Sequence, residues 1–143
     1  MRLGNNAKID LLKHVPLFSG CTKKELEALA LIADEIDLRE GSVLTREGQP
    51  GREFFVLVEG EVDVTQGGGD VARLQAGDWF GEIALLTKAS RTATVTAASP
   101  VRVLVVTDRA FRQVMEATPS IAVKMLERVG ERLAHDAETR EPA

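Results

Sequence analysis

The chain is poor in residues that cross-link or hold metals, with one cysteine, two histidines and no tyrosine among 143 residues. Cys21 stands alone and cannot close a disulfide within the chain. His14 and His135 lie near opposite ends of the sequence, so the usual spacing of zinc ligands is absent. We therefore expect Cys21, His14 and His135 to be structural residues, and we expect no metal site.

Long apolar runs are also missing. No stretch approaches the ~20 apolar residues that a membrane-spanning helix requires, and residues 1–15 lack the apolar core of a signal peptide. The charge is mildly acidic, with 18 Lys and Arg against 22 Asp and Glu and a net charge of −4. Such a balance gives no general attraction to nucleic acid or to acidic lipid. We expect a cytoplasmic protein without membrane or direct nucleic-acid partners.

The sequence pattern changes twice along the chain. A capping box at Thr22 and Glu25 predicts an amphipathic helix from Thr22 to about Asp34. Short β runs punctuated by glycine then extend from Ile36 to Val106, and the glycines at 67–69 with Asp70 predict a hairpin tip. Asp108 is expected to cap a helix through Ala117. Thr118 and Pro119 are expected to open a last helix to about His135, followed by a polar, frayed tail.

This order predicts an α+β fold in a single domain spanning residues 1–143, a typical domain size. A helical motif is expected over about 8–34, the β region over about 35–107, and two C-terminal helices over about 108–136. The short, closely spaced strands favour a barrel or a sandwich, with the helices packed against one side or end of it.

One segment, FGEIALLTKASRTATV at 80–95, is suited to binding a phosphate attached to a sugar. Gly81 allows the backbone to approach a ligand, and the amides of the three residues at 83–85 (Ile83, Ala84 and Leu85) are expected to open a helix whose N-terminal end attracts an anion. Arg91 offers a charged fork for two phosphate oxygens, while Glu82 can only accept hydrogen bonds and suits a sugar hydroxyl.

FGEIALL followed by SRTATV resembles the phosphate-binding cassette of the cyclic nucleotide-binding domain family. This family includes the catabolite activator proteins, the regulatory subunits of protein kinase A and the cyclic nucleotide-gated channels. VPLFSGCTKKELEALA is similar to its N-terminal helical motif, and EGxxGxxFFVLVEGEVDV to its glycine-punctuated β-roll. The resemblance covers about Leu11 to Leu133 and implies an eight-stranded antiparallel, jelly-roll-like β-roll. One departure is Ser90, where many members have proline, which loosens the loop.

The resemblance also implies roles for individual residues. Glu82 matches the family's ribose 2′-hydroxyl ligand, and Arg91 matches the residue that binds the cyclic phosphate. Thr92 and Ala93 would contribute small side chains and a backbone amide beside the phosphate. Thr92 would either help to select the base or simply favour a strand. Trp79 is interpreted as a packing residue, with stacking on the base as the alternative.

By this resemblance the chain is a receptor domain for cAMP or cGMP, with no other cofactor and no enzymatic activity. A cupin-like enzyme would need histidines in its β region, and there are none. A sensor half of a catabolite-activator-type (Crp/Fnr) transcription regulator is an alternative, because too few residues follow Val106 to form a helix-turn-helix domain. A degenerate domain acting in protein interaction is another, although the presence of Glu82 and Arg91 argues against it.

The last helix is expected to transmit the signal. In the family a C-terminal helix closes over the base, and residues from about Ile121 to Leu133 would take that place here. The helix carries an apolar seam with 4-3-4 spacing, which consists of Ala122, Leu126, Val129 and Leu133. We expect this seam to pack mainly against its own domain, with contact to a second copy or to an effector protein as the alternative.

Overall fold

A computed structural model of the chain describes residues 2–140, and their side chains as far as residue 135. The helical elements are α1 (Asn5–Lys13), the 3₁₀ turn η1 (Pro16–Phe18), α2 (Lys23–Leu31), α3 (Ile83–Leu86), α4 (Asp108–Ala117) and α5 (Pro119–Arg140). The strands are β1 (Asp34–Leu38), β2 (Val43–Thr45), β3 (Glu53–Glu59), β4 (Val62–Gln66), β5 (Gly69–Leu74), β6 (Trp79–Phe80), β7 (Thr94–Ala97) and β8 (Val101–Thr107).

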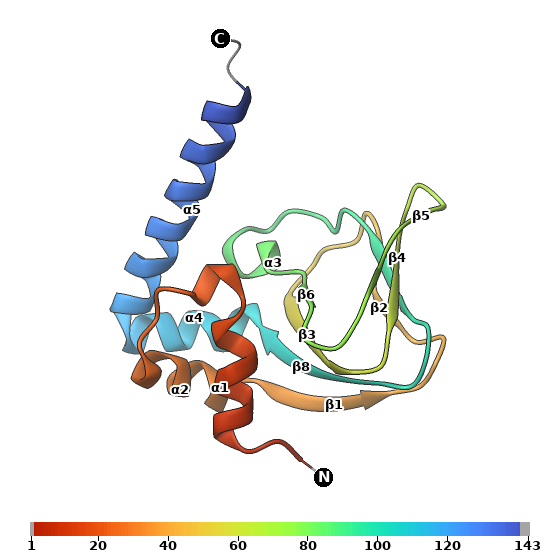
Figure 1. Ribbon diagram of the computed structural model, residues 1–143, viewed down its shortest axis with the longest axis horizontal. Coiled ribbons are helices and arrows are strands. Elements are labelled where there is room, and N and C mark those ends of the chain that lie inside the picture. Colours follow the sequence, from red (N-terminus) through yellow and green to blue (C-terminus); the bar gives the residue numbers. More distant parts are fainter. Residues whose placement is uncertain (1, 141–143) are drawn as a thin grey trace.

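The strands form two four-stranded antiparallel sheets, in the orders β1-β8-β3-β6 and β2-β7-β4-β5. The N-terminal and C-terminal helices gather on one side of this roll, and α5 extends away from it (Figure 1). The expected α+β fold with an eight-stranded antiparallel β-roll is therefore confirmed.

Strands β3 and β8 are buried on both faces of their sheet. Phe54 and Val56 of β3 pack with the helices, while the alternating residues Phe55 and Leu57 pack between the two sheets. Successive side chains of a strand point to opposite faces, so a strand covered on both sides must be apolar throughout. This burial on both faces explains the uninterrupted apolar run FFVLV at 54–58. It also fixes β3, the strand that pairs with β6 next to the candidate site.

The N-terminal helices follow the expected pattern. Thr22 caps α2 by accepting a hydrogen bond from the Glu25 amide, and the Glu25 carboxylate accepts one from the Thr22 amide at 2.7 Å, so the predicted capping box is present. The helix ends at Leu31, earlier than expected, because β1 already begins at Asp34.

The C-terminal helices correct two expectations. Thr107 rather than Asp108 caps α4, since its hydroxyl accepts a hydrogen bond from the Ala110 amide. The last helix does not end near His135, because α5 continues to Arg140, so the part of the expected frayed tail that the structure describes is helical. The residues beyond 140 lie outside the described chain.

The seam of α5 also differs from expectation. Leu126 and Leu133 are 72% and 64% exposed, whereas Ile121 and Met125 are the residues of this helix buried in the core. Two of the four seam residues thus point away from the domain, whereas Ala122 and Val129 are half-buried, because the face of α5 beside the seam is the one that packs against η1 and α4.

Two further details concern the strands. The hairpin tip is confirmed between β4 and β5, where Gly67 and Gly68 both have positive φ, as a tight turn of this kind requires. The short strand β6 was not anticipated, because two residues are too few to show alternation. Within residues 2–140, no helix has the length and apolar character needed to cross a membrane.

Candidate functional site

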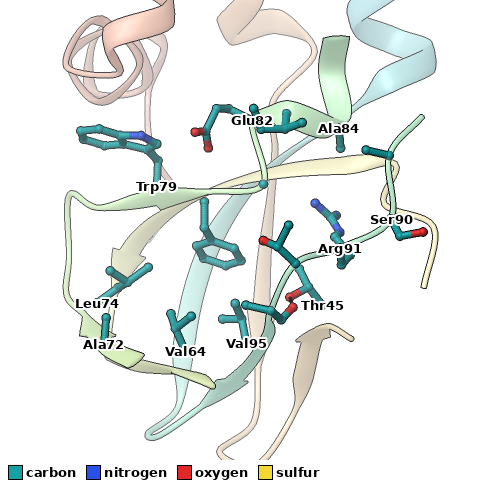
Figure 2. Close-up of a pocket in the computed structure, with 16 residues that line it drawn as sticks. Thr45, Val64, Ala72, Leu74, Trp79, Glu82, Ala84, Ser90, Arg91 and Val95 are labelled. Carbon is teal, nitrogen blue, oxygen red and sulfur yellow. Dashed lines mark hydrogen bonds between the residues drawn. The ribbon is translucent and has the colours of Figure 1, made fainter. Parts of the chain in front are cut away.

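A cavity of about 390 Å³ opens between the two sheets, next to α3. Figure 2 shows its two ends: Glu82, Ser90 and Arg91 at the upper rim, and Val64, Ala72, Leu74 and Val95 below. The residues that line it are Thr45, Val64, Ala72, Leu74, Trp79, Phe80, Gly81, Glu82, Ile83, Ala84, Ala89, Ser90, Arg91, Thr92, Ala93 and Val95. The cavity is therefore polar at one end and apolar at the other.

The structure brings most of the predicted site residues together. Gly81, Glu82, Ile83, Ala84, Arg91, Thr92 and Ala93 line the cavity. Leu85 does not, because its side chain is buried in the core that β3 shares with the helices. Only the backbone amide of Leu85, and not its side chain, could therefore take part in binding a ligand.

Arg91 is the principal charged group of the cavity. Its guanidinium donates a hydrogen bond of 2.6 Å to the backbone carbonyl of Glu53 and lies 6.0 Å from the centre of the Phe55 ring. Phe55 is itself stacked on Phe80, with ring centres 4.9 Å apart. Burial lowers the pKa of the Arg91 guanidinium, and a guanidinium stays charged in proteins.

No carboxylate of the described residues lies within ion-pair distance of Arg91. The carbonyl and the aromatic ring that hold this half-buried cation are both uncharged, so they do not neutralise its positive charge. The arrangement therefore favours an anion in the cavity.

Two glycines make room for the Arg91 side chain. A Cβ atom on Gly51 would lie 2.4 Å from Arg91 Nε, and one on Gly81 would lie 2.6 Å from Arg91 Nη1. Gly81 also has a φ of 83°, a conformation that side-chain-bearing residues rarely adopt. Gly81 was expected to admit a ligand, but the space beside it holds Arg91. Gly51 was not singled out from the sequence, because only the fold places it beside Arg91.

Glu82 is half-buried at the rim, near Trp79 (Figure 2). It makes no ion pair with Arg91, and no side chain of the described residues donates a hydrogen bond to it. Its carboxylate is thus free to accept hydrogen bonds from a ligand.

The helical turn after Glu82 offers fewer open amides than expected. The Ala84 amide donates to the Gly81 carbonyl at 3.0 Å, and the Leu85 amide donates to the Glu82 carbonyl at 3.1 Å. These bonds close the turn, and α3 has only 4 residues. Of the three amides expected to meet an anion, the one that remains open within the described chain is that of Ile83.

The segment that carries Arg91 is tied to the loop before β3. The Arg91 amide donates to the Gln49 carbonyl, and the Arg91 carbonyl accepts from the Gly48 amide, both at 2.8 Å. Ser90 forms an isolated antiparallel bridge with Pro50. The absence of proline before Arg91 was expected to loosen this loop, but the neighbouring loop holds it in place.

The apolar end of the cavity comes from the second sheet. Val64 of β4, Ala72 and Leu74 of β5 and Val95 of β7 form its wall. This surface can cover a flat, apolar ring at about 25 cal/mol for each Å² removed from water. The sequence predicts β runs at β4 and β5, but which face of the hairpin turns inward depends on the pairing of β4 with β7.

The residues set aside as structural remain apart from the cavity. Cys21 is half-buried, and burial raises the pKa of its thiol. Within the described residues, no group of three or more His, Cys, Asp or Glu side chains could hold a metal ion.

A β-roll whose cavity joins an arginine without an ion-pair partner to an apolar wall is suited to a small anionic molecule with an apolar ring. Comparison with known proteins gives the family: the model described as "Cyclic nucleotide-binding domain" matches residues 35–118, and the chain belongs to this family.

One relative is a regulatory subunit of a protein kinase. The chain is 40% identical over 116 residues to the cAMP-dependent protein kinase regulatory subunit of Mycosarcoma maydis, a match that covers 73% of this chain and 22% of that protein. The chain thus spans about a fifth of this relative's length.

Solved structures have the same fold. The N-terminal domain of a transcriptional regulator from Streptomyces coelicolor A3(2) superposes with a TM-score of 0.85 at 27% identity, over 94% of this chain and 96% of that chain. Cyclic-AMP-bound PfPKA-R superposes with a TM-score of 0.67 at 23% identity, over 89% of this chain and 46% of that chain.

Proposed function

We propose that the chain is a receptor domain that binds cAMP or cGMP at the cavity and transmits ligand binding through its C-terminal helices. The proposal rests chiefly on Arg91, a half-buried guanidinium held by a carbonyl and an aromatic ring, with no carboxylate of the described residues within ion-pair distance. The cyclic phosphate meets Arg91, the ribose 2′-hydroxyl donates to Glu82, and the purine lies toward the apolar wall. The domain makes no covalent change to its ligand and is not an enzyme.

The family membership supports this ligand class, and a structural relative is named as cAMP-bound. The choice between adenine and guanine depends on contacts to the edge of the base. Thr92 is exposed at the rim of the cavity, and its hydroxyl is one group able to make such a contact.

Calorimetric titration tests the proposal. We expect one cAMP or cGMP per chain with a dissociation constant near or below micromolar, equivalent to about 8 kcal/mol or more. Linear 5′-monophosphates serve as controls and are expected to bind far more weakly, because their second negative charge and open geometry do not match the site. The absence of heat and of a thermal shift with millimolar cAMP and cGMP would refute the proposal.

A second candidate is the sensor half of a transcription regulator. The match over nearly the full length of the N-terminal domain from Streptomyces coelicolor favours it. In that case ligand binding is unchanged, and the partner of α5 is a second copy of the sensor rather than a separate effector protein.

A further inference from the structure

Two polar side chains outside the expected site hold the backbone next to Arg91. Gln66, at the end of β4, donates its side-chain amide to the Thr92 carbonyl at 2.9 Å. Thr45, at the end of β2, donates its hydroxyl to the Ala93 carbonyl at 3.0 Å. The preceding carbonyl, that of Arg91, is engaged by the loop before β3 as described above. Three successive carbonyls are therefore fixed by groups from three different segments.

The amide groups of the same segment remain open. Neither the Thr92 nor the Ala93 N–H donates a hydrogen bond within the described part of the chain. Thr92 is exposed and Ala93 is half-buried, and both residues line the cavity. A buried backbone N–H normally has a hydrogen-bond partner, so the open amide of Ala93 is the more telling of the two. The natural partner for two open donors beside a guanidinium is an anionic oxygen.

Peptide geometry connects these two observations. A peptide unit is planar and trans, so its C=O and the N–H of the next residue point in opposite directions. The bond from Gln66 fixes the plane that carries the Ala93 N–H. The bond from Thr45 fixes the following plane, so Ala93 is held on both sides.

We infer that Thr45 and Gln66 are positioning residues of the ligand site, which orient the Ala93 amide toward a phosphate oxygen of the bound nucleotide. Thr45 is nearly buried, at 7% exposure, and lies beside the segment that carries Arg91 (Figure 2). Gln66 is exposed and does not line the cavity, so it acts on the ligand only through the backbone. This inference rests on the proposed function.

The test compares variants that lose the donor with variants that keep it. Thr45→Val and Gln66→Met preserve size but remove the hydrogen-bond donor, whereas Thr45→Ser keeps it. Thr65→Val is the matched control, because the Thr65 hydroxyl bonds to the next carbonyl, that of Thr94, which lies beyond the positioned amide. Each variant is titrated with cAMP and cGMP, and its melting temperature is recorded.

We expect Thr45→Val and Gln66→Met each to weaken nucleotide affinity by about 3- to 10-fold, the range of one hydrogen bond, and the double variant to lose roughly the product. Thr45→Ser and Thr65→Val should stay close to the parent chain. If Thr45→Val unfolds, the exposed Gln66 still decides the matter, since its replacement is expected to leave the melting temperature nearly unchanged.

The NMR chemical shift of the Ala93 amide provides a second measurement. It would not change if Thr45 and Gln66 only stabilised the fold. In the parent chain, saturation with nucleotide should shift the Ala93 amide proton downfield, and in the two donor-free variants this shift should shrink. The inference is overturned if the parent binds nucleotide and Gln66→Met binds equally well with an unchanged Ala93 shift. Direct contact of Thr45 alone would appear as a loss in Thr45→Val without any loss in Gln66→Met, and would also overturn it. A parent chain that binds neither nucleotide refutes the proposed function itself.

Discussion

Arg91 is a side chain whose geometry is fixed by its surroundings without any ligand. Gly51 and Gly81 leave room for its side chain because they lack Cβ atoms. The Glu53 carbonyl holds the guanidinium by accepting a hydrogen bond from it. Holding the guanidinium in one geometry reduces the conformational entropy that binding would otherwise cost. The residue is therefore expected to contribute more to affinity than a mobile surface arginine would.

The first prediction compares the two polar groups of the cavity. Arg91→Ala should lose roughly 2 to 4 kcal/mol of binding free energy and Glu82→Ala roughly 1 to 3 kcal/mol, because a charge-assisted contact exceeds a single bond to a hydroxyl. Both variants should fold, as judged by circular dichroism and thermal melting. Calorimetry measures the order, and an Arg91→Ala variant with parental affinity would remove Arg91 from the site.

The sequence predicts those residues of the candidate site that are neighbours in the chain. Gly81, Glu82 and Arg91 fall within one short segment, and all three line the cavity. Thr45, Gly51 and Gln66 are distant in sequence, and only the pairing of β2, β4 and β7 brings Thr45 and Gln66 to the Arg91 segment. A single sequence holds no information on such pairings beyond the strand pattern.

Among the elements, α2 and α5 are joined by a buried carboxylate. Glu25 of α2 accepts hydrogen bonds from Ser120 and Lys124 of α5, in addition to its own capping bond. The Lys124 and Ser120 bonds, in that order, lower the pKa of Glu25 from 4.5 to about 2. The N-terminal helical motif and the start of α5 are thereby tied together through one ionised group.

The second prediction concerns the pH dependence of this contact. Because the pKa of Glu25 is lower in the folded chain, its contribution to stability is complete above about pH 4.5 and is lost as the pH falls toward 2. Glu25→Gln should lower the free energy of unfolding by about 1 to 3 kcal/mol at pH 7 and flatten its decline with pH across that window.

Unfolding by denaturant at several pH values measures this effect. Glu27→Gln is the matched control, because Glu27 lies on the same helix but is exposed. An equal pH slope for Glu25→Gln and the parent chain would show that the carboxylate is not coupled to folding in this way.

The third prediction concerns movement of α5. No residue of this helix lines the cavity within the described chain, so closure over the base would require α5 to move from its place on η1 and α4. Ligand can cause such a shift only through its differential affinity for the closed form, typically worth about 1 to 3 kcal/mol. Hydrogen exchange should then change in residues 119–135 together with residues 80–95.

Protection that changes in residues 80–95 alone would mean that the ligand binds without this switch. Glu25→Gln offers a second check, because it weakens the tie that holds the start of α5 to α2. In that variant the exchange of residues 119–135 should already be faster without ligand.

The boundaries of the elements could be predicted from the sequence only in part. The capping box of α2 was recognised because its bonds are local, between residues three positions apart. The extension of α5 to Arg140 was not, because the polar residues at its end give no apolar period to follow. Strand β6 is defined by its bonds to β3 rather than by its own sequence.

For the whole molecule, the apolar seam of α5 is the feature that bears on association with another chain. Two of its residues, Leu126 and Leu133, are 72% and 64% exposed, and Val123 on the same helix is 55% exposed. An apolar stripe on a projecting helix is a common site for contact with another helix. A second copy or an effector protein would therefore meet the domain here.

The fourth prediction tests this contact. Leu126→Glu with Leu133→Glu should abolish any self-association that the parent chain shows in sedimentation equilibrium, while nucleotide affinity per chain stays within about threefold. Glu127→Gln, at an exposed position on the same helix, serves as the control. If the parent chain remains monomeric with and without cAMP at high concentration, the seam is left for a different protein, and the second-copy alternative fails.

Trp79 lies between the cavity and the helices, since it lines the cavity and also packs against the core that β3 shares with the helices. It is the single tryptophan of the chain. Its fluorescence is therefore an unlabelled optical probe of one place that is sensitive both to ligand entry and to rearrangement of the helices. In rapid mixing, an early phase whose rate rises with nucleotide concentration would report on entry, and a later phase independent of concentration would report on the helices. The fluorescence of Trp79 can thus show whether the helices rearrange after the nucleotide enters the cavity.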